Sequence, residues 1–114
     1  MTEPAKFPIR LTVTGAVQHG ATLKAVLLIG HPMESGFRTL ESGQRVPKNV
    51  IETLRVRLND TTLFQARTGI GISANPYFAF PVTLPEVASS EGWYLSVSWV
   101  DDKGQHGELK RELR

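Results

Sequence analysis

Trp93-Tyr94-Leu95-Ser96-Val97-Ser98-Trp99, near the end of the chain, shows the clearest alternation of apolar and polar residues in the sequence. Apolar residues at every second position alternate there with a tyrosine and two serines. A period of two is typical of a β-strand that has one buried face and one solvent-facing side. The same period recurs upstream, where Ile9, Leu11 and Val13 alternate with arginine and threonine.

Further strand patterns occur throughout the chain, separated by turn residues such as Asn59-Asp60 and Asp101–Gly104. The segment 22–29 has apolar residues on both faces, which indicates a central or covered strand. No segment predicts a helix of two or more turns. We therefore expect an all-β fold, an immunoglobulin-like two-sheet antiparallel β-sandwich of about seven strands. The expected strands are 9–14, 22–29, 53–58, 62–66, 77–82, 93–99 and 105–113.

Length and composition exclude several classes of protein. The 114 residues predict one domain spanning 1–114, with 1–6 as a loose N-terminal tail. The net charge is only +2, and the basic residues form no concentrated face, so we expect no nucleic-acid partner. No apolar run is long enough for a transmembrane helix, so we expect no membrane partner. Since the chain has no cysteine, it lacks a disulfide, a thiolate metal site and a cysteine nucleophile.

Two proline-containing corners lie at predicted strand ends, and both contain more side chains with possible chemical roles than a simple loop requires. The first, residues 30–36, opens a connection through residue 48 that is rich in glycine and proline. Long ordered connections in compact domains are often functional. The second corner, residues 73–77, precedes an aromatic strand. We interpret both corners as the border of a binding surface, and we expect the reacting group to lie outside the corners.

Neither corner predicts a catalytic or metal site. His31 and Met33 are residue types that copper accepts, but two such residues do not make a site. The simpler interpretation is that the His31 ring bonds a backbone group and Met33 fills a gap. Ser73 is not in a nucleophile elbow, and with Asn75 it is expected to bond the local backbone. We therefore predict no enzyme, no metal and no cofactor.

One outer face is expected to be more apolar than a monomer requires. Val26 and Leu28 lie opposite the buried side of their strand, and Tyr77 and Tyr94 lie opposite the core side of theirs. Exposed tyrosines on a sandwich face are frequent anchors for a protein partner. This pattern predicts a stable protein interface.

Three segments, in this order, resemble the SoxZ family of the bacterial thiosulfate-oxidising Sox system. They are His31-Pro32-Met33-Glu34-Ser35-Gly36, Ser73-Ala74-Asn75-Pro76-Tyr77-Phe78 and Ser98-Trp99-Val100-Asp101-Asp102-Lys103-Gly104. The first two are fairly specific and the third is a generic hairpin. The resemblance extends over about residues 7–113. It implies a non-catalytic β-sandwich paired with a SoxY-like carrier subunit, as a heterodimer or a higher assembly. That partner's flexible glycine-rich arm bears the cysteine on which sulfur intermediates travel.

The resemblance also implies a periplasmic location, reached by export in complex with a signal-bearing partner, and transient contact with other Sox enzymes. Our hypothesis places both corners near the partner interface or the docking surface of the arm, with His31 and Asn75 offering hydrogen-bond donors to an anionic sulfur group. The alternative is a free-standing immunoglobulin-like protein-binding module whose ligand is unknown. The candidate interface residues are His31, Pro32, Met33, Glu34, Ser73, Asn75, Pro76 and Tyr77.

Overall fold

The computed structural model describes residues 7–87 and 92–114, and the expected N-terminal tail, 1–6, lies outside them. Within those two ranges the chain forms seven strands and no helix, which confirms the predicted all-β class. Consequently, no helix of the described part is long and apolar enough to cross a membrane. The strands are β1 (Ile9–Thr14), β2 (Thr22–Ile29), β3 (Ile51–Leu58), β4 (Thr61–Arg67), β5 (Tyr77–Thr83), β6 (Trp93–Asp101) and β7 (His106–Leu113).

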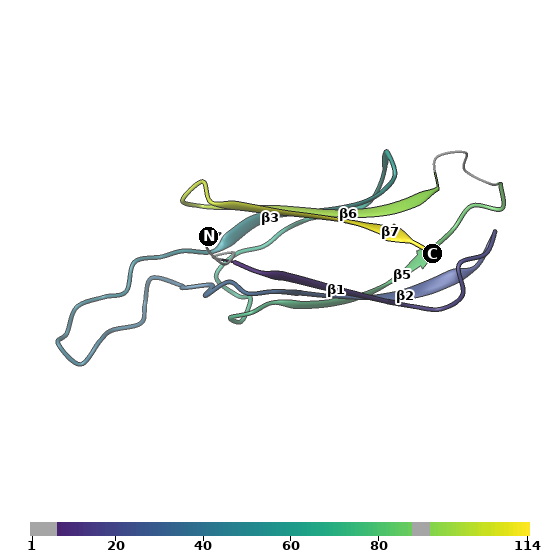
Figure 1. The fold of residues 1–114 in the computed structure, drawn as a ribbon. Coiled ribbons are helices and arrows are strands. Elements are labelled where there is room, and N and C mark those ends of the chain that lie inside the picture. Colours follow the sequence, from purple (N-terminus) through teal and green to yellow (C-terminus); the bar gives the residue numbers. More distant parts are fainter. Residues whose placement is uncertain (1–6, 88–91) are drawn as a thin grey trace, which may run out of the picture.

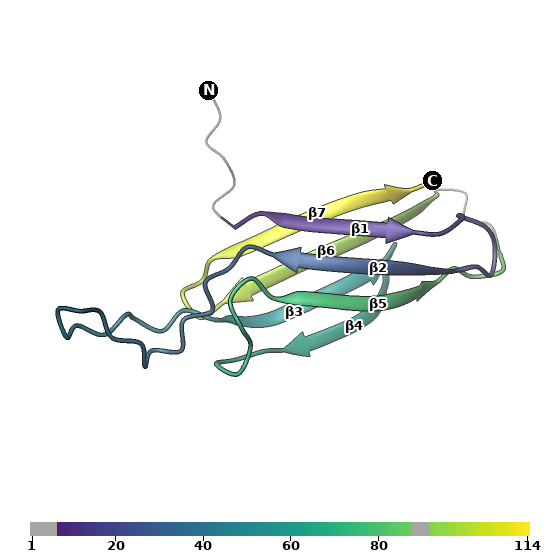
Figure 2. The same ribbon diagram turned by 90° about the horizontal axis from the view of Figure 1, so that it is seen from below.

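The strands form two antiparallel sheets stacked face to face (Figure 1). One sheet has three strands in the order β1-β2-β5, and the other has four in the order β4-β3-β6-β7. Hairpins join β3 to β4 and β6 to β7, as the turn residues at 59–60 and 101–104 predicted. Figure 2 shows the three-stranded sheet in front of the four-stranded one. This is the predicted immunoglobulin-like sandwich.

The core lies between the sheets and follows the period-two pattern. In β2 the inward residues Leu23, Ala25, Leu27 and Ile29 are buried, and Trp99 of β6 is buried opposite them. Burying one such large apolar side chain contributes roughly 1.5–3 kcal/mol. Since β2 is the central strand of its sheet, the apolar residues on its other face have neighbours on both sides, as the pattern indicated.

The connection between β2 and β3 is a narrow ribbon, residues 34–49, that projects beyond the end of the sandwich (Figures 1 and 2). At its base, the backbone amides and carbonyls of Glu34 and Asn49 exchange hydrogen bonds of 2.7 and 2.9 Å. Further out, Thr39 and Arg45 form a second bridge. The ribbon is therefore ordered by its own ladder although it packs against neither sheet face.

Candidate functional site

The two proline corners predicted from the sequence lie side by side. The Asn75 amide donates a hydrogen bond of 2.8 Å to the His31 carbonyl, and the Ile29 amide donates one of 3.1 Å to the Pro76 carbonyl. The pairing of β2 with β5 brings them together, because Leu28 and Tyr77 are cross-strand partners at the same end of the sheet. The corners thus form one structural unit at the root of the ribbon.

His31 lies at the centre of this unit and is fully buried. The Met33 amide donates to its Nδ1 at 3.0 Å, so Nδ1 is an acceptor and Nε2 carries the proton. Nε2 then donates to Oδ2 of Asp101 at 3.0 Å. Phe7 and Trp99 pack around the ring, with centroid distances of 5.0 and 5.3 Å. The interpretation that the ring bonds a backbone group and that Met33 fills a gap is confirmed.

The Asp101 carboxylate accepts hydrogen bonds from several parts of the chain. Oδ1 takes the amides of Lys103 and Gln105 at 2.9 and 2.8 Å. Oδ2 takes His31, the Asn49 side chain at 3.1 Å and the Gln105 side chain at 2.9 Å. Burial raises the pKa of Asp101, but the hydrogen bonds from His31, Asn49 and the two amides outweigh it and hold the pKa below its usual value. Asp101 is thus a satisfied buried carboxylate.

The same cluster holds the returning strand of the ribbon. The Asn49 side chain also donates to Oδ1 of Asp102 at 3.0 Å, and the Val50 amide donates to the same oxygen at 2.9 Å. The Ile51 amide points at the Met33 sulfur, 3.3 Å away. Both strands of the ribbon are therefore fixed at its root to the β6–β7 turn. We call His31, Met33, Asn49, Asp101, Asp102 and Gln105 the root cluster.

The predicted site residues divide into a buried and an accessible group. His31, Met33 and Pro76 are buried, whereas Pro32, Ser73, Asn75 and Tyr77 are exposed. Glu34 is half-buried, and its carboxylate accepts a hydrogen bond of 2.6 Å from the Arg38 guanidinium. This hydrogen bond lowers the pKa of the Glu34 carboxyl. The structure gives both His31 nitrogens partners within the chain, so only the exposed residues are presented to another molecule.

Two corner residues have left-handed backbones without being glycine. Met33 has φ of 48° and Asn75 has φ of 53°. Asparagine tolerates this region well, but methionine does so less readily. At Met33 the conformation directs the amide to His31 and the sulfur toward Ile51, both inside the root cluster. This geometry aims the first strand of the ribbon away from the sandwich.

The root cluster has the residue types of an acid–base site but not its geometry. His31 and Asp101 are fully buried, and the two ring nitrogens of His31 are occupied by the Met33 amide and the Asp101 carboxylate, neither of which is a hydroxyl or a thiol. Catalysis through such a pair needs a nucleophile within hydrogen-bond reach. Residues 7–87 and 92–114 also contain no group of three His, Cys, Asp or Glu residues arranged to hold a metal ion. The cluster's evident role is to position the ribbon.

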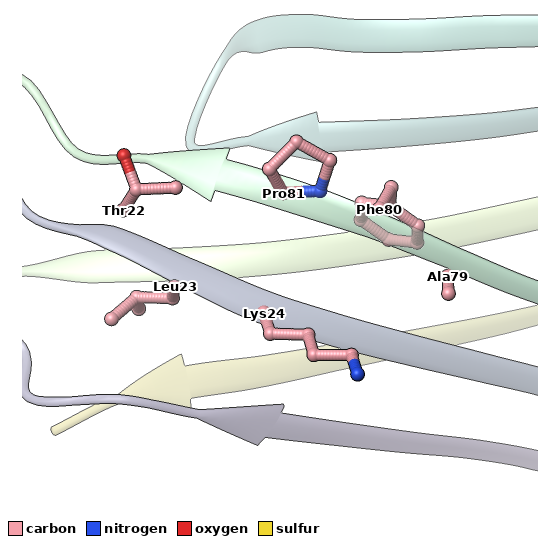
Figure 3. A pocket seen from close by; sticks show the side chains of 6 residues that line it. All are labelled: Thr22, Leu23, Lys24, Ala79, Phe80 and Pro81. Carbon is pink, nitrogen blue, oxygen red and sulfur yellow. The ribbon is translucent and has the colours of Figure 1, made fainter.

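Apolar residues of β2 and β5 lie together on the outside of the three-stranded sheet, beside the polar residues of β1. Tyr77 pairs with Leu28, Ala79 with Val26, and Pro81 with Lys24. Tyr77 is 63% exposed. A shallow hollow of about 360 Å³ lies beside Lys24, Ala79 and Pro81 (Figure 3). We call Val26, Leu28, Tyr77, Ala79 and Pro81 the apolar face. Of the four residues named in this prediction, Val26, Leu28 and Tyr77 share one outer face, whereas Tyr94 lies on the four-stranded sheet.

Sequence reasoning overlooked Asn49 and Gln105 and treated Asp101 only as a turn residue. A signal for two of the buried polar residues was nevertheless present. His31 continues the inward phase of Leu23, Ala25, Leu27 and Ile29, and Asp101 continues that of Trp99. Because β2 and β6 both reach the ribbon end of the sandwich, the period of two places both side chains in the interior there. Asn49 and Gln105 follow no such period.

The fold and the site define an immunoglobulin-like β-sandwich with an apolar outer face, whose buried polar residues hold a projecting ribbon in place. Residues 9–111 match the family model of the sulphur oxidation protein SoxZ, and the chain belongs to this family. Membership gives the chain a role in the Sox sulfur-oxidation system and a partnership within that system. No curated protein matches the chain.

Proposed function

We propose that this chain is the non-catalytic subunit of a SoxYZ-type sulfur-carrier complex, in which it scaffolds a SoxY-like partner. The partner supplies the cysteine that carries sulfur intermediates during thiosulfate oxidation. The absence of cysteine from all 114 residues supports this division of labour. The root cluster supports it as well, because its histidine and carboxylates are occupied by structural hydrogen bonds.

The observation that carries the proposal is the exposed Tyr77, which lies between the apolar face and the root of the ribbon. On one side Tyr77 adjoins Leu28 of the apolar face. On the other it follows the Asn75–Pro76 corner, which is bonded to the start of the ribbon connection. The ribbon itself presents Phe37, which is 69% exposed, and Leu40, which is 46% exposed. Large exposed apolar side chains of this kind are typical of a protein-interaction site.

The physical requirement on such a complex is a rigid base for a mobile thiol. An arm that visits several Sox enzymes must be flexible, so its attachment and the features those enzymes recognise are best held by a rigid scaffold. The two packed sheets supply rigidity, and the root cluster extends it to the ribbon. Transient contact with the other Sox enzymes and a periplasmic location, reached by export with the partner, belong to the same proposal.

Co-expression with a SoxY-like partner tests the proposal. The two chains are expected to purify as one complex, in which this chain is non-catalytic and the partner cysteine becomes modified on addition of thiosulfate with Sox enzymes. The variant Tyr77→Glu places a charge in the proposed interface and is expected to weaken the complex at least tenfold. Val100→Glu is the matched control, because Val100 is 46% exposed on the opposite sheet. A chain that remains a stable monomer and ignores the partner would contradict the proposal and favour the free-standing binding module.

A further inference from the structure

The outer face of the four-stranded sheet differs in character from the apolar face. Its strand register places Arg57 of β3, Ser96 of β6 and Lys110 of β7 abreast in one row. A hydroxyl therefore stands between two cationic side chains that rise from the same surface. In the adjacent row, Ser98 lies between Arg55 and Glu108.

Two hollows open over this row. One, of about 450 Å³, is lined by Arg57, Ser96, Ser98, Lys110 and also Glu108. The other, of about 210 Å³, is lined by Arg57, Ser96 and Lys110, with Asn59, Asp60 and Tyr94 at its edges. Because Ser96 and Ser98 of β6 have small side chains, space remains between the longer side chains on either side of them. Arg57, Ser96 and Lys110 are the residues common to both hollows.

Several donors in the row can form further hydrogen bonds. The Arg57 guanidinium donates through Nη2 to the Asp60 carbonyl at 3.1 Å, but its Nε is buried and has no partner among the described residues. The Lys110 ammonium lies 4.6 Å from the centre of the Tyr94 ring, a contact that leaves its N–H donors available. The row thus combines an arginine fork, an ammonium and a hydroxyl.

Among the described residues, three acidic ones lie near the row, namely Asp60, Glu108 and Glu112. Glu112 stands opposite Tyr94 and forms an ion pair of 2.8 Å with Arg114. The Asp60 carboxylate is 4.0 Å from the Arg57 guanidinium and its side chain is fully exposed, so water screens this ion pair. Glu108 belongs to the next row, opposite Ser98, and lines only the larger hollow. Each hollow is thus lined by two cationic residues and one carboxylate, which leaves an excess of positive charge at the row.

We infer that the row Arg57–Ser96–Lys110 binds the sulfo group of a sulfur oxyanion, at a site separate from the partner interface. Charge-assisted hydrogen bonds from arginine and lysine are the strongest that a tetrahedral oxyanion forms with side chains. The assignment to sulfur rests on the proposed function. The same –SO₃⁻ chemistry is present in free sulfate or thiosulfate and in a sulfonated thiol of the carrier arm.

Titration of the isotopically labelled chain with sodium sulfate or thiosulfate, followed by NMR, tests the site. Sodium chloride at equal ionic strength is the reference. Saturable shifts of the Arg57, Ser96 and Lys110 amides are expected, with affinity at least tenfold weaker in Arg57→Gln/Lys110→Gln. The control, Arg10→Gln/Lys24→Gln, removes the same charge from the opposite sheet and should bind as the native chain does. If the double variant does not fold, the single variant Lys110→Gln is titrated in its place and is also expected to bind more weakly than the native chain.

A second titration distinguishes the two sources, and it uses a short glycine-rich peptide with a single cysteine whose thiol carries a sulfonate group. Affinity at least tenfold above that of sulfate supports a group carried on the arm, and equal affinity supports the free ion. Shifts that follow ionic strength alone, or that persist equally in the row variants, would overturn the site. A chain that binds sulfate but ignores the partner would overturn the proposed function and leave the oxyanion site standing as a free-ion site.

Discussion

His31 donates a hydrogen bond of 3.0 Å from Nε2 to Oδ2 of Asp101, across 70 positions of sequence and in a fully buried setting. This contact joins the start of the first corner to the turn between the last two strands. Because Asn49 binds the same carboxylate oxygen at 3.1 Å, the bond also ties together both strands of the ribbon. The orientation of the ribbon thus depends on one carboxylate.

The variant Asp101→Asn is expected to lower the free energy of unfolding by about 2–4 kcal/mol, because it removes a charged acceptor and places an amide group among existing donors. Urea denaturation measures the loss. Asp60→Asn, at a fully exposed turn position, is the control and should change stability by less than about 0.5 kcal/mol. Equal stability of the two variants would show that the root cluster contributes little.

The free energy of unfolding is expected to decrease at acidic pH. Burial raises the pKa of Asp101 but its hydrogen bonds lower it further, so the folded value lies below the ordinary one of about 3.9. A depressed carboxyl pKa stabilises the folded chain fully above the ordinary value, and this stabilisation is lost as the pH falls through the folded value. Asp102 and Glu34, whose pKa values are also lowered, act in the same direction.

Unfolding free energies measured between about pH 6 and pH 2 check this dependence, since carboxyl groups titrate in that range. Asp101→Asn should fall less steeply with acidification than the native chain. An identical slope in both proteins would assign the acid sensitivity to other carboxylates.

Gly107→Ala is expected to destabilise the sandwich by about 1–3 kcal/mol through overpacking. A Cβ at this position would overlap Nε1 of the Trp99 indole and lie 2.8 Å from its Cε2. The indole has no room to retreat, because Phe7 and His31 pack against its other sides. Gly69→Ala, where nothing lies within 4 Å, is the control. Thermal unfolding compares them, and equal midpoints would contradict the tight contact.

Phe37→Ser is expected to weaken the complex with the carrier partner by about tenfold while leaving the stability of the isolated chain unchanged, because Phe37 is 69% exposed. Isothermal titration calorimetry and thermal unfolding measure the two quantities. Val87→Ser, at a residue that is 74% exposed near the end of β5, is the matched control. A loss of stability without a loss of affinity would show that Phe37 packs within the ribbon instead.

Much of the fold was predictable because period-two alternation reports burial directly. The pattern at 93–99 located β6, and the patterns at 9–14 and 22–29 matched β1 and β2 as observed. Strand ends moved by one or two residues where polar groups continue the pairing. Asp101, for instance, extends β6 two positions beyond Trp99 because it pairs with Ile51.

The composition of the root cluster was less predictable, because it depends on which strands become neighbours. Asn49 and Gln105 lie 56 positions apart, and no local pattern joins them. Their shared hydrogen-bond partner, Asp101, is polar and stands beside turn residues, so local chemistry alone favours an exposed turn. Only the stacking of the two sheets makes it an interior acceptor.

Because the root cluster orients the ribbon, the orientation of the ribbon depends on how far the rest of the chain has folded. Its contacts span separations of 18 residues for Met33–Ile51, 52 for Asn49–Asp101 and 70 for His31–Asp101. Contacts of such long range cost much loop-closure entropy, so we expect them to form late in folding. The ribbon therefore acquires its direction once the final hairpin has docked. A partner that recognises it selects chains that have finished folding over those that have not.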